Sequence, residues 1–266
     1  MLVIGERING MFKNVREAIV AGDRSVIQDL AKRQLASGAT MLDVNVGPAT
    51  DEKEKAMVWL VESIREVTKA PLSIDSPNAA VVRAGLKLAG PGSMINSSTG
   101  KADDLAKFLP LAQEMDASLI GLTIDESGVP STTDGRVEIA MRILAAAMEH
   151  DIPPDRLYID PIALPVNVAQ DQPVRVFEAL SQFAMLSDPA PHTVVGLSNA
   201  SQRCQERELI SRTYLVMTMA HGLDSAIMDV FDTELMNAMI TAELLMNKAI
   251  YCDAYLDAYR KSQRPA

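Results

Sequence analysis

The chain has 266 residues, a hydrophobic content of 48% and a formal net charge of −10 at pH 7. This negative balance argues against a nucleic-acid partner, because a phosphate backbone attracts positively charged proteins. No apolar run approaches the roughly 18 residues that a membrane-spanning helix needs, so we expect no association with a membrane.

The chain starts with MLVIGERING, which lacks a basic segment followed by a long apolar core. Cys204 and Cys252 lie far apart and without the spacing of a zinc site. We therefore expect a cytoplasmic protein with reduced thiols. No Pro/Gly/Ser-rich linker divides the sequence, which predicts a single domain over residues 1–266.

Strand-like apolar runs alternate with amphipathic helical runs along the chain. The expected strands are 2–8, 40–47, 71–76, 93–97, 117–124, 157–162, 193–199 and 225–230. The expected helices are 25–37, 51–68, 79–89, 103–115, 137–150, 174–186, 206–221 and 233–259. Eight such units in about 250 residues are typical of an α/β fold of the (β/α)8 TIM-barrel type. The alternative, an open doubly wound sheet, would normally carry a glycine-rich phosphate turn after its first strand, and none is present.

The third expected strand, PLSIDS, is the clearest indication of where a functional site would lie. Leu72 and Ile74 form an apolar run that stops at Asp75. Ser76 and Pro77 then have the pattern of an N-cap followed by a first helical residue, and Asp51 with Glu54 suggests a capping box on the preceding helix. Asp75 is thus expected at the carboxyl end of a strand, where parallel α/β folds meet their ligands.

The same arrangement, an apolar run that ends in polar groups, recurs in every expected strand. The residues concerned are Glu6, Arg7, Asn9, Asp43, Asn45, Asp75, Asn96, Thr123, Asp125, Asp160, Ser198, Asn199 and Asp229. Such a ring suits a flat, neutral ligand rich in donors and acceptors, since carboxylates pair with adjacent N–H groups. The structural alternative is a ring of loop caps; Asp43, within its strand, is better explained as a core hydrogen-bonding group, and Asp229 fits either role.

No histidine is expected at a strand end, because His150 and His221 close helices and His192 precedes a strand. This disfavours a histidine base and a metal site. Asp75 and Asp160 could form a glycosidase pair, but one Trp and 4% aromatic residues provide few platforms for sugar rings. The Met-rich end of the chain (Met236, Met239, Met246) is expected to pack on the barrel or on a second subunit.

At these strand ends the motifs GERING, DVNVG, SIDS, INS, GLT, YIDP and GLSN follow one another in order. In this the chain resembles the pterin-binding barrels, which include dihydropteroate synthase and the folate domain of cobalamin-dependent methionine synthase. It is most similar to methyltetrahydrofolate:corrinoid/iron–sulfur protein methyltransferases, and the resemblance runs essentially end to end. One departure is the stretch after Asn96, SSTGKADD, where relatives often have a second Asn.

The resemblance implies a homodimer that binds 5-methyltetrahydrofolate and passes its methyl group to Co(I) of a corrinoid carried by a corrinoid iron–sulfur protein, in the acetyl-CoA (Wood–Ljungdahl) pathway. By motif position it implies that Asp75, Asn96 and Asp160 hold the pterin and that Asn199 lies near N5. Gln202 and Arg207 would lie at the mouth. The full set of candidate site residues is Glu6, Asn9, Asn45, Asp75, Asn96, Asp160, Ser198, Asn199, Gln202 and Arg207, with Asn199, Asp75 and Asn96 catalytic.

Two further functions stay open on the sequence. A dihydropteroate synthase-like condensing enzyme would need a pyrophosphate site with basic loops, whereas the second-strand loop here, GPATDEKEK, is acidic. A non-catalytic folate-binding subunit of a corrinoid complex would need the same pterin contacts and no methyl transfer.

Overall fold

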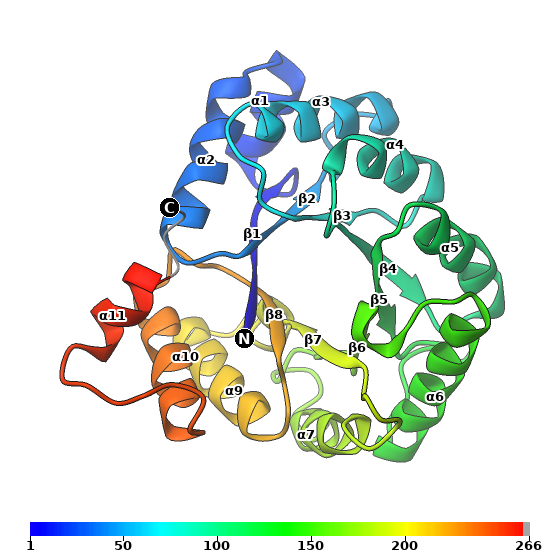
Figure 1. Cartoon of the computed structure of the whole chain (residues 1–266), viewed down its shortest axis with the longest axis vertical. Helices are drawn as coiled ribbons and strands as arrows, with labels where there is room; N and C mark the ends of the chain where they lie inside the picture. Colours follow the sequence, from blue (N-terminus) through cyan, green and yellow to red (C-terminus); the bar gives the residue numbers. More distant parts are fainter. Residues whose placement is uncertain (263–266) are drawn as a thin grey trace.

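The computed structural model describes residues 1–262 and shows a closed barrel of eight parallel strands in sequential order, β1 to β8. The strands are β1 (Leu2–Asn9), β2 (Met41–Asn45), β3 (Leu72–Asp75), β4 (Met94–Thr99), β5 (Ser118–Leu122), β6 (Leu157–Asp160), β7 (His192–Gly196) and β8 (Ser225–Met228). β1 pairs with β8, which closes the ring (Figure 1). The (β/α)8 prediction is confirmed, and the open-sheet alternative is wrong.

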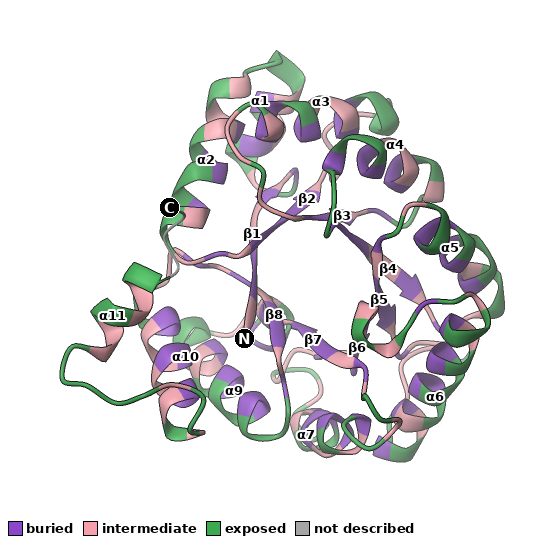
Figure 2. Ribbon diagram, in the orientation of Figure 1, coloured by how far each residue is buried: buried purple, intermediate pink, exposed green. Residues whose placement is uncertain are grey.

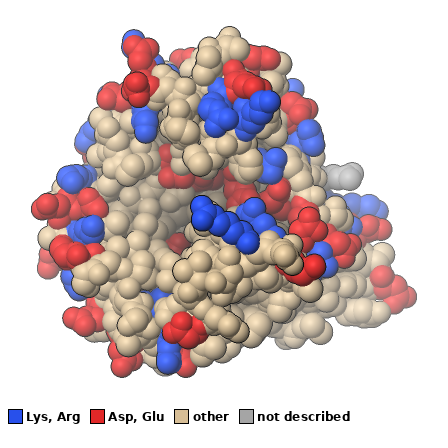
Figure 3. All heavy atoms as spheres, turned by 180° about the vertical axis from the view of Figure 1, so that it is seen from behind, with Lys and Arg blue, Asp and Glu red and all other residues tan. Residues whose placement is uncertain are grey.

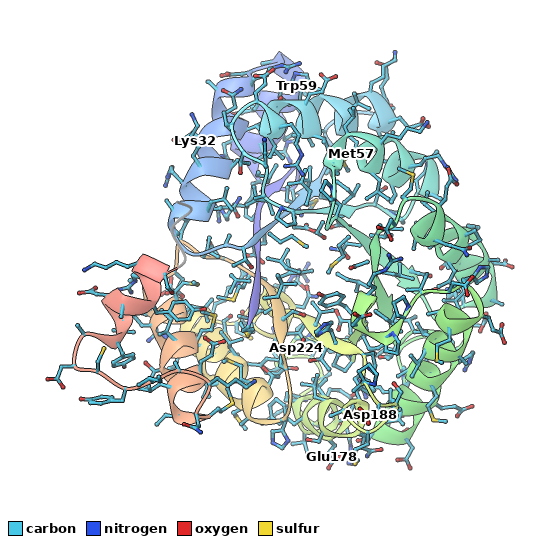
Figure 4. All side chains as sticks on the ribbon, in the orientation of Figure 1. Lys32, Met57, Trp59, Glu178, Asp188 and Asp224 are labelled. Carbon is cyan, nitrogen blue, oxygen red and sulfur yellow. The ribbon has the colours of Figure 1, made fainter. Side chains whose placement is uncertain are left out.

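Helices surround the barrel with their buried faces turned to the strands and their exposed faces turned outward (Figure 2). They are α1 (Lys13–Ala21), α2 (Arg24–Ala36), α3 (Lys53–Arg65), α4 (Ala79–Ala89), α5 (Ala102–Glu114), α6 (Thr133–Glu149), α7 (Gln172–Phe183), α8 (Leu197–Ala200), α9 (Arg207–Ala220), α10 (Thr233–Leu245) and α11 (Tyr255–Ser262), with a 3-10 turn η1 (Pro154–Arg156). Met57 of α3, labelled in Figure 4, is fully buried in the layer between strands and helices. Within residues 1–262 no helix combines the length and the hydropathy needed to cross a bilayer.

The barrel interior is filled by side chains and is not a pore. Ile4, Met41, Met94, Ile120 and Val194 form a buried cluster inside the ring, separate from the larger core between strands and helices. This plug leaves the carboxyl ends of the strands as the open end, in keeping with barrels of this type.

The amino-terminal end of the barrel is closed by polar contacts. Asp224, labelled in Figure 4, precedes β8, accepts a hydrogen bond from the Thr193 N–H at 3.0 Å and pairs with the His192 ring at 2.6 Å. His192 stacks on Tyr158 with ring centroids 4.7 Å apart. This histidine therefore lies at the opposite end from the candidate site.

Two helix predictions are wrong. The expected helix 233–259 is broken: α10 ends at Leu245, Asn247 takes a left-handed conformation (φ 58°), and α11 returns along α10. The hydroxyl groups of Thr241 and Tyr255, 2.9 Å apart, join the two helices. Conversely, α1 occupies a stretch for which no helix was predicted; its buried Val15 and Ala18, three residues apart, were the available signal.

Three element ends also differ from expectation. The cap of α4 is Asn78, which accepts from the Ala80 N–H at 2.9 Å, while Ser76 accepts from Asn78 one turn earlier. The N-cap of α3 is Glu52 and makes no side-chain cap, so the expected capping box is absent there. The seventh strand stops at Gly196. Because α8 begins at Leu197, Ser198 and Asn199 belong to a helical turn and not to a strand end.

Candidate functional site

Strand register places four candidate residues in one row at the barrel mouth. Asn9 of β1 lies opposite Asn45 of β2, Asn45 opposite Asp75 of β3, and Asp75 opposite Asn96 of β4. Figure 3 shows this face, hollowed at its centre, with carboxylate side chains inside the hollow and basic side chains crossing its rim. The sequence therefore predicted correctly that these polar groups meet at one end of the barrel.

The first two loops approach each other closely enough to require glycine. A Cβ on Gly10 would lie 2.0 Å from the Val46 carbonyl oxygen, and Gly47 adopts φ 58°. The Gly10 N–H donates to the Asn45 carbonyl at 2.9 Å, and the Asn9 side chain accepts from the Met11 N–H. The Asn9 amide oxygen is thus engaged in its own turn, which leaves this residue with a role in loop geometry.

Asp43, which is buried, and Asp75, which is half-buried, each accept a hydrogen bond from an asparagine amide. Asn45 donates to Asp75, and its own oxygen accepts from the Gly47 N–H. Asn96 donates to Asp43 at 3.0 Å, and Ser73 donates to the same oxygen at 2.7 Å. Asp43 is the core hydrogen-bonding group that its position within the strand suggested, and it orients Asn96 from below.

Burial governs the charge of this pair. Desolvation raises the pKa of Asp75 to about 6, partly offset by the hydrogen bond from Asn45. Desolvation and the neighbouring Asp75 carboxylate raise the pKa of Asp43 well above its usual range. Each carboxylate therefore opposes ionisation of the other, and the two titrate as a pair.

Asp160, at the end of β6, is 7% exposed and is held by backbone donors. Its side chain accepts from the Ile162 N–H at 2.7 Å, and the Gly196 N–H also stabilises its charged form. Desolvation nevertheless raises the pKa of Asp160 to about 7. Ile162 itself has φ 66°, unusual for a β-branched residue, so the loop that holds Asp160 is strained, as functional loops often are.

Glu6 faces the opposite side of the mouth. The Ser198 hydroxyl lies 2.8 Å from both carboxylate oxygens of Glu6. Desolvation raises the pKa of Glu6, and the Ser198 hydrogen bond and the Arg207 charge lower it. The helical turn of α8 is what brings Ser198 to β1, since a continuing strand would have carried it past the mouth.

An irregularity in β1 separates the directions of Glu6 and Arg7. The register with β2 shifts between Gly5 and Ile8, and the buried Gln34 side chain accepts the Arg7 N–H that this shift frees, at 2.9 Å. Arg7 reaches Asp229 at 3.2 Å and lies 4.1 Å above the Phe12 ring. Such bulges re-aim side chains near active sites.

Asn199 lies against β7 from the first turn of α8. A Cβ on Gly196 would come within 2.9 Å of the Asn199 amide nitrogen, so the amide covers Gly196. Asn199 is exposed, and among the contacts of residues 1–262 its side chain has no hydrogen-bond partner. It does not cap a helix, and its amide is available to a ligand in the mouth.

Gln202 and Arg207 are exposed at the rim, beyond α8 and at the start of α9. Arg207, Glu6, Ser198 and Asp229 line a side cavity of about 210 Å³ that adjoins the mouth. A second cavity of about 340 Å³ touches Asn45, Gly47, Asp75 and Pro77. These candidate residues therefore divide between two cavities, with Glu6, Ser198 and Arg207 at the first. Asn45 and Asp75 lie at the second.

Three strand-end residues are bound to partners in the protein itself. Asp125 closes a turn with Ser127 and pairs with Arg142 on the outer helix α6. Thr123 donates to the Asp160 carbonyl at 3.0 Å. Asp229 accepts from the Phe231 N–H and pairs with Arg7. In the part of the chain that the structure describes, no three His, Cys, Asp or Glu side chains converge as a metal site would require.

One buried residue behind the site was missed by the sequence analysis. Arg136 of α6 is fully buried and donates to the Pro161 carbonyl, next to Asp160, at 2.7 Å. It falls on the apolar face of its helix with Ile139, Ala140 and Ile143. An arginine in such a stripe is the signal that could have identified it, because charges are seldom fully buried without a partner.

The comparisons with known proteins agree with this geometry. The model of the pterin binding enzyme family matches residues 13–229. The chain belongs to the pterin binding enzyme family. The predicted resemblance is thereby confirmed, and the barrel with its ring of strand-end carboxylates and amides is the pterin-binding fold of this family.

Individual relatives are more distant. A methylcorrinoid:tetrahydrofolate methyltransferase of Eubacterium limosum is 29% identical over 265 residues, which are 99% of this chain and 97% of that protein. A methionine synthase of Mycobacterium tuberculosis is 31% identical over 240 residues, 85% of this chain but only 20% of that protein. The solved dihydropteroate synthase of Coxiella burnetii with pteroic acid aligns with a TM-score of 0.69 at 16% identity, covering 93% of this chain and 94% of that one, which shows the shared fold.

Proposed function

We propose that this pterin binding enzyme moves a methyl group between 5-methyltetrahydrofolate and the cobalt of a corrinoid carried by a partner protein. The observation that carries the proposal is the polar set at the barrel mouth, made of the half-buried Asp75 and Asn96 and the buried Asp160, with the free Asn199 amide nearby. These groups match the donors and acceptors of a pterin ring.

Asp160 is the group best suited to the N–H-rich edge of the pterin. That edge carries a 2-amino group next to a ring N–H, and a carboxylate can accept from both at once. Asp160 is held by backbone N–H groups and removed from water, so its hydrogen bonds to a ligand do not have to displace a mobile side chain. Asp75 and Asn96, in register on neighbouring strands, provide an acceptor and a donor for the rest of the ring.

The methyl transfer itself demands little covalent chemistry from the protein. N5 of the donor is a tertiary amine, and an amine departs easily only when its nitrogen is protonated or hydrogen-bonded as the C–N bond breaks. The Asn199 amide, lying over Gly196 without another partner, can donate to N5 and strengthen that bond as N5 gains basicity. The corrinoid supplies the nucleophile, so no Ser, Cys or His nucleophile is needed in the barrel.

The open rim suits a large second substrate. Gln202 and Arg207 are exposed at the edge of the mouth and leave the pterin site accessible from solvent. The methyl group on N5 must point outward for the corrinoid of another protein to reach it. We assign Gln202 and Arg207 to contacts with the folate tail or the docked corrinoid.

The relatives support the reaction class more than its details. The Eubacterium limosum protein is named for methyl transfer between a methylcorrinoid and tetrahydrofolate, and it aligns over nearly the full length of both chains. Its name puts the methylcorrinoid first, opposite to the direction we predicted from the resemblance. The corrinoid iron–sulfur protein partner, the homodimer, the acetyl-CoA pathway and the cytoplasmic location stay predictions for this chain, as does its single domain over residues 1–266.

The test is a methyl-transfer assay with reduced free cobalamin. Purified protein, 5-methyltetrahydrofolate and Co(I) cobalamin should yield methylcobalamin, followed by its absorbance, and the Asn199→Ala variant should be much slower. If the protein binds 5-methyltetrahydrofolate but neither forms methylcobalamin nor consumes it in the reverse reaction, the non-catalytic folate-binding subunit is favoured. Product from a hydroxymethylpterin pyrophosphate and p-aminobenzoate would instead favour the condensing enzyme.

A further inference from the structure

We infer that Arg136, buried behind the barrel wall, is a positioning residue that keeps Asp160 charged and fixed for ligand binding. This role rests on the proposed function only in what the ligand is; the link between Arg136 and Asp160 is a property of the free protein. Arg136 lies on α6, outside the strands, and touches no part of the mouth itself.

Hydrogen bonds first fix where the guanidinium lies. Its Nε donates to the Pro161 carbonyl at 2.7 Å, Nη1 to the Thr132 carbonyl at 3.3 Å and Nη2 to the Gln172 side chain at 2.8 Å. Pro161 is the residue between Asp160 and Ile162. The Ile162 N–H donates to the Asp160 carboxylate. Arg136 therefore pins, from behind, the short loop that presents Asp160.

The charge of Arg136 is unusual because the side chain is fully buried and all three of these acceptors are neutral. A buried guanidinium is costly unless negative charge lies nearby. Burial lowers the pKa of Arg136; Tyr214, Asp171 and, to a smaller extent, Asp160 raise it, while Arg175 lowers it further. Gln172, which accepts from Arg136, donates in turn to Asp171 at 2.9 Å.

The effect is mutual. Among the groups that act on Asp160, the Ile162 and Gly196 N–H groups and the Arg136 charge all favour the carboxylate, and burial opposes them. The Tyr214 hydroxyl is buried and has no hydrogen-bond partner within residues 1–262. Its pKa is raised by burial and by the Asp160 charge and lowered by the Arg136 charge. Arg136 is the positive charge among these groups, so its removal leaves burial less opposed.

Two substitutions separate charge from hydrogen bonding. Arg136→Gln keeps a donor for the Pro161 carbonyl and removes the charge, while Arg136→Lys keeps the charge. Arg142→Met is the matched control, because Arg142 lies on the same helix, is exposed and pairs with Asp125 away from the mouth. A purely structural role predicts that the Gln and Lys variants disturb the site alike.

The experiment measures the Asp160 titration in the free protein by carbon NMR with carboxyl-labelled aspartate, the resonance being assigned by its loss in Asp160→Asn. We expect the titration midpoint of Asp160 to rise by about one pH unit in Arg136→Gln. Well below the midpoint, this lowers the charged fraction of Asp160 about tenfold. Arg136→Lys should stay near the wild type, and Arg142→Met should equal it. An unshifted midpoint in a folded Arg136→Gln protein overturns the inference, as does a Lys variant that shifts as far as the Gln variant.

A ligand arm extends the test. Affinity for 5-methyltetrahydrofolate, measured by calorimetry from pH 6 to 9, should fall about fivefold at pH 7 in Arg136→Gln, because a midpoint near pH 7 rises by about one unit, and it should recover at high pH. Failure of the wild type to bind this ligand refutes the proposed function and leaves the NMR result standing. If Arg136→Gln does not fold, the substitution is made in the Asp160→Asn protein, so that the gain from Asp160→Asn itself is common to both proteins compared. A loss of unfolding free energy smaller than the whole unfolding free energy of the wild type supports the pairing of the two charges, and a loss at least that large contradicts it.

Discussion

Substitution of Asp160 by Asn should make the protein more stable while it removes pterin binding. The carboxyl group is 7% exposed, and burial raises its pKa from 3.8 to about 7. Between these two values the folded protein binds a proton that the unfolded chain has lost. Stability therefore declines as pH rises from about 4 to about 7, because the unfolded state then binds fewer protons than the folded state.

The magnitude follows from the size of that shift. A displacement of about three pH units corresponds to about 4 kcal/mol of destabilisation at pH 8 and above, relative to a group that carries no charge. An Asn side chain retains one oxygen that can accept from the Ile162 N–H but cannot serve Gly196 as a carboxylate does, which costs about 1 kcal/mol. The net gain at pH 8 should then be a few kcal/mol.

Chemical denaturation of both proteins at several pH values between 4 and 9 provides the measurement. The difference in unfolding free energy should favour Asp160→Asn increasingly from pH 5 to pH 8 and then level off. In the same samples the Asn variant should lose measurable affinity for 5-methyltetrahydrofolate. A stability difference that is flat over this range, or one that favours the wild type at pH 8, would refute the account of Asp160 as a desolvated carboxylate.

Three other outcomes are expected. Asn199→Ala should slow methyl transfer by roughly two to three orders of magnitude, as the loss of an oxyanion-type donor does, and should change the melting temperature little, since this exposed side chain has no other partner within residues 1–262. Gly196→Ala should mimic part of that loss, because its new methyl group meets only the Asn199 amide; a variant with full rate would mean that this amide does not act from over Gly196. Asp75→Ala should weaken the binding of 5-methyltetrahydrofolate by about 1.5–3 kcal/mol in calorimetry, and unchanged affinity would mean that the pterin ring does not contact Asp75.

The barrel and its row of polar strand ends could be predicted from the sequence because both depend on local patterns. Alternating apolar runs set the strands, and a closed parallel barrel brings their carboxyl ends together whatever the details of the helices. Asp75 and Asp160 accordingly lie where their strands stop. Asp43, too, could be placed in the core because it interrupts an apolar run.

What escaped prediction depends on contacts between distant segments. Asn199 seemed to end a strand, yet Ser198 contacts Glu6 across 192 residues and the chain turns into α8 at Leu197 instead. Arg136 stands out in its helix, but two of its acceptors, Pro161 and Gln172, lie 25 and 36 residues away, so its link to Asp160 could not be read from the sequence. The segment between α10 and α11 contains no proline that would predict the break. The contact that holds the reversed chain joins the Tyr255 and Thr241 hydroxyl groups.

The most direct test of the central claim is a crystal structure of the protein with 5-methyltetrahydrofolate. We predict that the pterin lies across the barrel mouth, with its 2-amino edge within hydrogen-bond distance of the Asp160 carboxylate, its ring against Asp75 and Asn96, and N5 facing Asn199 with the methyl group directed outward. A pterin bound instead in the side cavity beside Arg207, or with N5 turned away from Asn199, would contradict the account.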